Sequence, residues 1–118
     1  MFRLVETRCG GDSFLLAPVT EHVIYKAHFP GYPITPGVCI LSLVGQLLAL
    51  RLNTPMVLKE ARNVKFVNAI FPDGATLIEV LFQKIVQTDA DMIHVQGIIR
   101  GPEKVYCKFS LLYAEDVV

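Results

Sequence analysis

The residues best suited to chemistry lie in one short segment, HFPGYPITPG, which begins at His28 and ends at Gly37. An imidazole with an unperturbed pKa of about 6.5 can take up or release a proton at neutral pH, so His28 is a candidate general base. Prolines at every third position, Pro30, Pro33 and Pro36, exclude a helix or a central strand here. The segment therefore predicts a stiff loop that positions the histidine, and the alternative is that His28 only caps this loop.

A helix is expected directly after the loop. Thr35 is a preferred N-cap residue, proline at position 36 suits the first helical position, and apolar residues continue from Val38 to Leu52. The run Asn53-Thr54-Pro55 then ends the helix. Because this helix is apolar on nearly every side, we expect other elements to wrap around it.

One face of the expected helix carries small and polar side chains. Ser42, Gly45, Gln46 and Ala49 fall at i, i+3, i+4 and i+7, so they lie side by side and leave room for another group to approach. Near the amino end, Gly37 has a backbone N–H without a partner inside the helix, in the region where the helix dipole favours negative charge. This amide could bind an oxygen that carries negative charge, or the glycine could only relieve crowding beside the preceding proline.

Extended segments flank the helix. Four of them follow it, are rich in β-branched and aromatic residues and are separated by turn residues, so they predict an antiparallel meander. The expected strands are Met1–Arg8, Ser13–Ala17 and His22–Ala27 before the helix, and Val57–Phe71, Ala75–Gln87, Met92–Arg100 and Lys104–Tyr113 after it. One long buried helix combined with such strands predicts an α+β fold in which a sheet curls around the helix.

The size and composition of the chain predict one domain over residues 1–118 that associates with a second chain. A chain of 118 residues is too short for two cores, and its 53% hydrophobic residues exceed what a small domain buries alone. We therefore expect a homodimer or a higher homo-oligomer, or burial of apolar surface against a hydrophobic ligand. The 11 basic and 11 acidic residues balance, which argues against a nucleic-acid partner.

The sequence predicts a cytoplasmic location. Its first residues lack the pattern of a signal peptide, and no apolar run reaches the roughly 18 residues that a membrane span requires. Cys9, Cys39 and Cys107 are odd in number and lack the spacing of metal ligands, which is typical of free thiols in a reducing compartment.

The segment from His28 to Val38 closely resembles the HFPGxPxxPGV motif of the 3-hydroxyacyl-[acyl carrier protein] dehydratases, which have the hotdog fold. The runs ARNVKF at 61–66 and FPDG at 71–74 are also similar to this family, so the resemblance covers roughly residues 20 to 114. It implies a hotdog fold, in which a curved antiparallel sheet wraps a long central helix.

The same resemblance implies an active site between two chains, with a histidine from one loop and a carboxylate from the other chain's central helix. His28 takes the place of the base, and the Gly37 amide that of the group binding the thioester oxygen. The family's acid comes fourteen residues after the histidine, where this chain has Ser42. The implied substrate-binding residues are Phe29, Pro30, Gly31, Pro36, Val38, Gln46 and Phe66.

Ser42 departs from the family pattern at a position that matters for catalysis. A hydroxyl is a far weaker acid than a carboxyl group and carries no charge at neutral pH. Ser42 and Gln46, one turn apart, could position a water that delivers the proton, or Ser42 could only fill space in a site that no longer catalyses dehydration. Since a general acid or base contributes about 10²–10⁴-fold, a chain with His28 and Gly37 alone could be slow without being inert.

These observations predict a dehydratase-like lyase that acts on 3-hydroxyacyl thioesters in fatty-acid or related lipid biosynthesis, with acyl carrier protein as its partner. Eliminating water needs only proton transfer and charge stabilisation, so neither a metal nor a cofactor is expected. One alternative is a hotdog acyl thioesterase. Another is a non-catalytic subunit that binds the carrier and pairs with a homologous chain supplying the carboxylate.

A basic cluster could bind the acidic carrier, or could be an ordinary solvated surface. Its members are Arg51, Lys59, Arg62 and Lys65.

Overall fold

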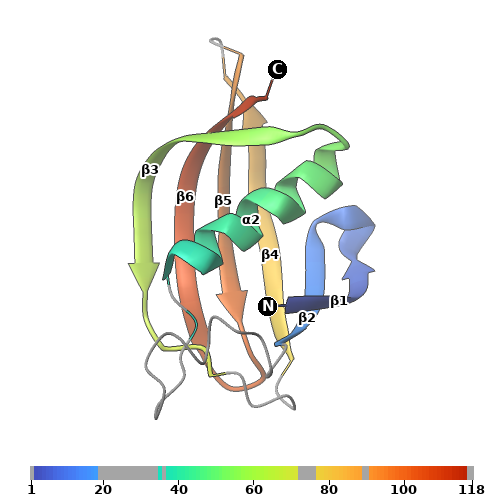
Figure 1. Cartoon of the computed structure of the whole chain (residues 1–118), viewed down its shortest axis with the longest axis vertical. Coiled ribbons are helices and arrows are strands. Elements are labelled where there is room, and N and C mark those ends of the chain that lie inside the picture. The colour runs from blue at the N-terminus through green and yellow to red at the C-terminus, as the bar shows by residue number, and fades with distance from the viewer. Residues whose placement is uncertain (1, 19–34, 36, 72–76, 89–90, 117–118) are drawn as a thin grey trace.

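The computed structural model describes residues 2–18, 35, 37–71, 77–88 and 91–116. Within these ranges one long helix lies across a curved antiparallel sheet (Figure 1). The elements are β1 (Phe2–Arg8), a 3-10 turn (Cys9–Gly11), β2 (Ser13–Pro18), α2 (Gly37–Leu52), β3 (Met56–Phe66), β4 (Ile78–Gln87), β5 (Met92–Arg100) and β6 (Val105–Glu115). This arrangement confirms the predicted α+β class with a sheet curled around a helix.

The sheet has six strands in the order β1-β2-β4-β5-β6-β3, and every neighbouring pair is antiparallel. β4, β5 and β6 form the expected meander. The expectation that the strand after the helix belongs to this meander was wrong, because β3 pairs with β6 and not with β4. Eleven residues, 67–77, separate β3 from β4 in the sequence, which is too many for a tight hairpin, and β3 lies at an edge of the sheet whereas β4 lies in its middle.

The core lies between α2 and the concave face of the sheet. Five helix side chains point toward the strands and are 0–8% exposed: Ile40, Leu43, Val44, Leu47 and Leu48. They pack in one cluster with side chains of the central strands, including Val80, Val95, Ile99 and Leu111, each of which is at most 1% exposed. The 3.6-residue period of the helix and the alternation along the strands place these residues on facing surfaces.

The opposite face of α2 is open in the single chain. Val38, Ser42, Gln46 and Leu50 follow one another at intervals of four residues and are all exposed, Val38 to 75% and Leu50 to 62%. The sheet wraps the inner face of the helix as predicted, whereas the described residues leave this outer face uncovered. The apolar residues of this face are therefore available for contact with a group that the described residues do not supply.

The two ends of α2 are held by backbone contacts. Before the helix, Thr35 is buried and its N–H donates a hydrogen bond of 2.9 Å to the carbonyl oxygen of Ile70. At the other end Asn53 adopts φ of 53°, the left-handed conformation that commonly follows a helix, and the Thr54 N–H donates to the Ala49 oxygen. The helix begins at Gly37 and ends at Leu52, close to the predicted range.

Other predicted boundaries agree to within a few residues, except that the expected strand Val57–Phe71 ends at Phe66 and the expected strand Ala75–Gln87 begins at Ile78. The expected strand His22–Ala27 lies outside the described residues. Within the described ranges, no helix has both the length and the hydropathy that crossing a membrane requires.

Candidate functional site

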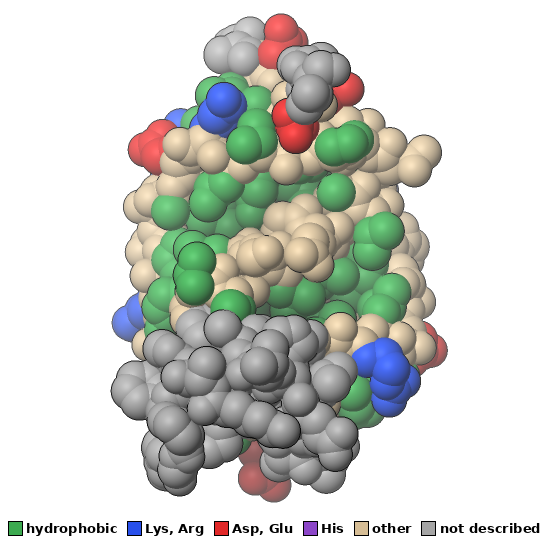
Figure 2. Space-filling model, in the orientation of Figure 1, with side chains coloured by type: hydrophobic (Ala, Val, Ile, Leu, Met, Phe, Trp, Pro, Cys, Tyr) green, Lys and Arg blue, Asp and Glu red, His purple; other side chains and the backbone are tan. Residues whose placement is uncertain are grey.

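An apolar groove of about 550 Å³ runs beside the open face of α2. Its walls are α2 and the first residues of β3, and Tyr113 of β6 also lines it. Figure 2 shows this face, with hydrophobic side chains lining hollows beside the helix. The lining residues are Val38, Leu41, Ser42, Gly45, Gln46, Ala49, Pro55, Met56, Val57, Leu58 and Tyr113.

The stripe predicted from the sequence forms the helix side of this groove. Ser42, Gly45, Gln46 and Ala49 all line it, and so does the candidate substrate-binding residue Val38. The side-chain amide of Gln46 donates a 3.4 Å hydrogen bond to the Ser42 hydroxyl oxygen. Because the Ser42 oxygen accepts this bond, its own O–H can donate to a water or a ligand.

The amino end of α2 brings together two more candidate residues, Gly37 and Phe66. A methyl group placed on Gly37 would come within 2.9 Å of the Phe66 ring, which is closer than real contacts allow. The Phe66 ring is nonetheless half exposed. A side chain at position 37 would therefore require the exposed Phe66 ring to move, and glycine lets this ring lie over the helix start. The first N–H groups of a helix have no partner within it, so the Gly37 amide suits a partly negative oxygen.

The remaining candidates, His28, Phe29, Pro30, Gly31 and Pro36, lie outside the described residues. The structure thus places Val38, Ser42 and Gln46 along one groove, and Gly37 with Phe66 at the helix start. His94, the one histidine of the described ranges, lies on β5 with its Nε2 atom 2.7 Å from the Ser110 hydroxyl oxygen.

Sequence reasoning missed the residue of the groove with the most unusual environment, Tyr113. Its side chain is 1% exposed, and among the described residues its hydroxyl has no hydrogen-bond partner. Burial raises the pKa of Tyr113 to about 12, so the phenol stays protonated at neutral pH. The sequence offered no signal for it, because its contact with Gly45 joins a strand to a helix that is distant along the chain.

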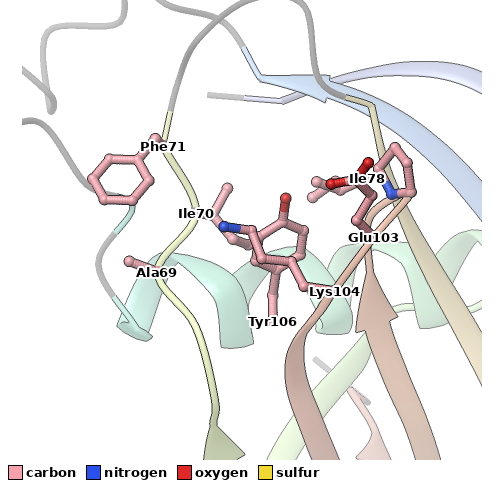
Figure 3. Close-up of a pocket in the computed structure, with 8 residues that line it drawn as sticks. Ala69, Ile70, Phe71, Ile78, Glu103, Lys104 and Tyr106 are labelled. Carbon is pink, nitrogen blue, oxygen red and sulfur yellow. The ribbon is translucent and has the colours of Figure 1, made fainter.

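A second cavity of about 290 Å³ lies near the start of β4 and the turn between β5 and β6 (Figure 3). Ala69, Ile70 and Phe71 form one side of it, and Lys104 and Tyr106 form another. The Lys104 ammonium lies 5.9 Å from the centre of the Tyr106 ring, within range of a cation–π contact. None of the candidate residues named above lines this cavity, so the groove beside α2 is the stronger candidate site.

The predicted basic cluster is only partly available. The guanidinium of Arg51 forms a 2.7 Å ion pair with Asp12, across from the helix end, and Arg62 lies 3.7 Å from Glu60. Lys59 and Lys65 remain as exposed cations on β3.

The three cysteines are free thiols, with Cys9 exposed, Cys39 intermediate and Cys107 buried. Burial raises the pKa of Cys107 to about 11, so this thiol is unreactive at neutral pH. Among the residues that the structure describes, His, Cys, Asp and Glu side chains form no group of three that could hold a metal ion.

The arrangement of one helix across a curved six-stranded antiparallel sheet is that of the hotdog fold, and solved structures of that fold match it over most of the chain. One is the dehydratase heterocomplex ApeI:P from Xenorhabdus doucetiae, with 15% identity, 87% of this chain and 86% of that chain covered, and a TM-score of 0.65. Another is the PaaI protein of the phenylacetic acid degradation operon of E. coli, with 12% identity, 98% and 80% coverage and a TM-score of 0.65.

A third is a hypothetical thioesterase from Streptococcus pneumoniae with coenzyme A, with 12% identity, 98% and 88% coverage and a TM-score of 0.62. At such identities the likeness shows the fold alone. No curated protein matches the sequence of the chain.

The family model of the ApeI dehydratases matches residues 14–97, which is more than half of the chain. The chain therefore belongs to the ApeI-like dehydratase family. The predicted hotdog fold is confirmed, and the predicted relation to dehydratases is confirmed at the level of this family.

Proposed function

We propose that this protein dehydrates 3-hydroxyacyl thioesters, with the acyl group bound in the groove beside α2. The observation that carries the proposal is the position of Ser42 and Gln46, which lie at the edge of an apolar groove in a chain of a dehydratase family. An apolar cavity with a few polar groups on one side suits an acyl chain whose reacting end carries oxygen atoms.

The chemistry requires three roles. His28 removes the proton next to the thioester carbonyl, and the Gly37 N–H stabilises the negative charge that develops on the carbonyl oxygen. The leaving hydroxyl must also receive a proton. Ser42, whose oxygen accepts from Gln46, holds a water that passes a proton to the leaving hydroxyl and regains one from the His28 imidazolium, in place of the family's carboxylic acid.

Hydration of a crotonyl thioester, the reverse reaction, tests this assignment. We expect the purified protein to consume the enoyl absorbance, and His28→Ala to lower the rate about 10²–10⁴-fold, because a general base contributes that much. His94→Ala is the matched control, since His94 lies on β5 and bonds Ser110, and it should leave the rate unchanged. Equal rates for the wild-type protein and His28→Ala would refute the assignment of the base.

A second copy of the chain completes the proposed site. β3 is an edge strand of the described sheet, so one side of its backbone has no neighbouring strand among the described residues, and Val57 and Leu58 on it are more than a third exposed. The open face of α2 adds Val38 and Leu50 to the same apolar surface. Pairing two such surfaces would bury these residues and cover the unpaired edge of the sheet.

Light scattering tests the homodimer. We expect the mass of two chains, and Leu50→Lys should weaken the association at least about tenfold, because it places a charge in a buried apolar surface. Leu4→Lys is the control, since Leu4 is 43% exposed on β1 at the opposite edge of the sheet. A wild-type protein with the mass of one chain would contradict the proposal.

The second candidate function is that of a subunit in a heteromeric dehydratase, whose partner chain supplies the carboxylate. It is favoured by Ser42 at the acid position and by the likeness to a dehydratase heterocomplex. If the protein alone is inactive and Ser42→Glu makes it active, this second function is supported. Release of free thiol without an enoyl product would instead support the thioesterase alternative.

The carrier and the location are further parts of the proposal. We propose an acidic acyl carrier protein as the donor of the acyl group, bound near the exposed Lys59 and Lys65 of β3. We also place the protein in the reducing cytoplasm, where its free cysteines stay reduced.

A further inference from the structure

Tyr113 is a buried hydrogen-bond donor at the groove, and no group in the described chain accepts a hydrogen bond from its hydroxyl. The residue belongs to β6, where it pairs with Leu58 of β3 on one side and Ile93 of β5 on the other. Its ring lies under the helix, and a methyl group placed on Gly45 would be 3.5 Å from the phenol oxygen. Gly45, which also lines the groove, places no side chain over this oxygen.

An unpartnered hydroxyl at such a depth is unusual. Buried polar groups in folded proteins nearly always have a partner, and those without one mark a ligand, an ion or a bound water. The other two polar side chains of the groove, Ser42 and Gln46, bond to each other. Both are exposed to solvent, so Tyr113 is the buried donor of the groove that the described chain leaves without a partner.

The surroundings of Tyr113 define the chemistry of the missing acceptor. None of the described residues that line the groove carries a charge, so these residues offer a carboxylate or phosphate no counterion. The phenol is protonated at neutral pH and therefore donates, and the uncharged described lining favours an uncharged oxygen as its acceptor. The fitting ligand is an apolar chain that carries a hydroxyl or a carbonyl oxygen.

We propose that Tyr113 is a substrate-binding residue whose hydroxyl donates a hydrogen bond to an uncharged oxygen of the acyl group in the groove. This inference rests on the proposed function, since it takes the acyl thioester as the ligand. It adds a contact from the sheet side of the groove, where neither the loop motif nor the helix stripe places a residue.

Binding of three probes to the wild-type protein and Tyr113→Phe tests the inference by calorimetry. The probes are the N-acetylcysteamine thioesters of 3-hydroxyoctanoic and octanoic acid, and S-octyl-N-acetylcysteamine, which lacks both the hydroxyl and the thioester carbonyl. We expect Tyr113→Phe to lower the affinity for at least the hydroxyacyl thioester roughly 3- to 10-fold, which corresponds to the loss of one neutral hydrogen bond. The affinity for the S-octyl compound should not change.

The pattern across the probes identifies the acceptor. A loss confined to the hydroxyacyl thioester assigns the bond to the hydroxyl, and an equal loss with both thioesters assigns it to the carbonyl. Tyr106→Phe is the matched control, because Tyr106 is also a buried tyrosine of β6 but lines the second cavity (Figure 3). It should leave all three affinities unchanged.

Two results would overturn the inference. One is an unchanged affinity of Tyr113→Phe for every probe, which would mean that the phenol bonds a trapped water. The other is a loss of self-association in Tyr113→Phe without a change of affinity, which would place the acceptor in a second chain.

Turnover is measured separately, so the inference and the proposed function can fail independently. Binding through Tyr113 without dehydration or hydration would sink the function and leave the inference standing. If the protein turns over its substrate and Tyr113→Phe changes neither this turnover nor the affinities, the proposed function stands and the inference about Tyr113 is wrong.

Discussion

Two buried hydroxyl groups of this protein, those of Ser13 and Tyr113, have opposite surroundings. Ser13 on β2 is 0% exposed, and its hydroxyl donates a 2.5 Å hydrogen bond to the Glu79 carboxylate. Glu79 in turn accepts a 2.6 Å bond from Arg100, its direct neighbour across β4 and β5. Tyr113 is buried to nearly the same degree, yet no described residue accepts its proton.

This difference distinguishes a buried polar group that stabilises the fold from one that is available to bind a ligand. Near Ser13 the chain completes its own network, so the folded state alone satisfies every partner named there. Near Tyr113 the chain leaves a donor beside an apolar groove and an open helix face. A buried hydroxyl without a partner lowers the stability of the folded state. Binding of a ligand that accepts its hydrogen bond would remove this cost, which adds to the affinity.

The largest expected effect is on the Ser13 side. Ser13→Ala removes the first partner of the Glu79 carboxylate, and we expect the free energy of unfolding to fall by about 1–3 kcal/mol. Tyr113→Phe should leave it unchanged or slightly higher, because it deletes a hydroxyl that forms no bond within the described chain. Urea unfolding followed by circular dichroism measures both. A clear loss of stability in Tyr113→Phe would show that the phenol serves the fold.

Gly45→Ala offers a test of opposite sign on the groove side. The new methyl group would contact Tyr113 at 3.5 Å, an ordinary van der Waals distance, so the helix should gain about 0.5–1 kcal/mol from replacing glycine. The same methyl narrows the space above the phenol, and we expect weaker binding of the 3-hydroxyoctanoyl thioester. Thermal unfolding and calorimetry give the two quantities.

Ala49→Gly is the control for Gly45→Ala, because it reverses the change on the same face of the helix. It should lower the stability by a similar amount. Because Ala49 also lines the groove, this change widens the groove instead of narrowing it, so binding of the 3-hydroxyoctanoyl thioester should not fall as it does in Gly45→Ala. If Gly45→Ala were strongly destabilising, the space beside Tyr113 would be smaller than the geometry of the groove indicates.

The sequence was sufficient to predict most of the fold. The prolines of the loop and the apolar run after them predicted where the helix begins and how long it is. Segments rich in β-branched residues predicted the strands. The partner of β3 could not be predicted, because pairing with β6 depends on the path of the connection after Phe66 and leaves no local pattern.

Residues of the candidate site could be predicted where the pattern that reveals them lies within one short stretch of sequence. The stripe of Ser42, Gly45, Gln46 and Ala49 follows from helical spacing alone, and the structure places all four along the groove. Tyr113 could not be found, because its importance arises from Gly45 on another element. The exposure of Val38 and Leu50 was also hidden, because they are as apolar as the buried residues of the same helix.

Acid titration of stability gives the last test of the comparison. The Ser13 hydrogen bond, and then Arg100, hold the pKa of Glu79 below its ordinary value of 4.5. The stabilisation from this carboxylate is therefore fully present above about pH 4.5 and is lost as the pH falls through the lower pKa of the folded state. Urea unfolding of the wild-type protein and Glu79→Gln, from about pH 6 to pH 3, isolates this contribution. The difference between the two should shrink as the pH falls, whereas the difference between wild type and Tyr113→Phe should stay constant, because a phenol with a pKa of about 12 does not titrate in this range. A pH-independent difference for Glu79→Gln would mean that the Ser13 network does not depend on the charge of Glu79, and the contrast between the two hydroxyl groups would then rest on Tyr113 alone.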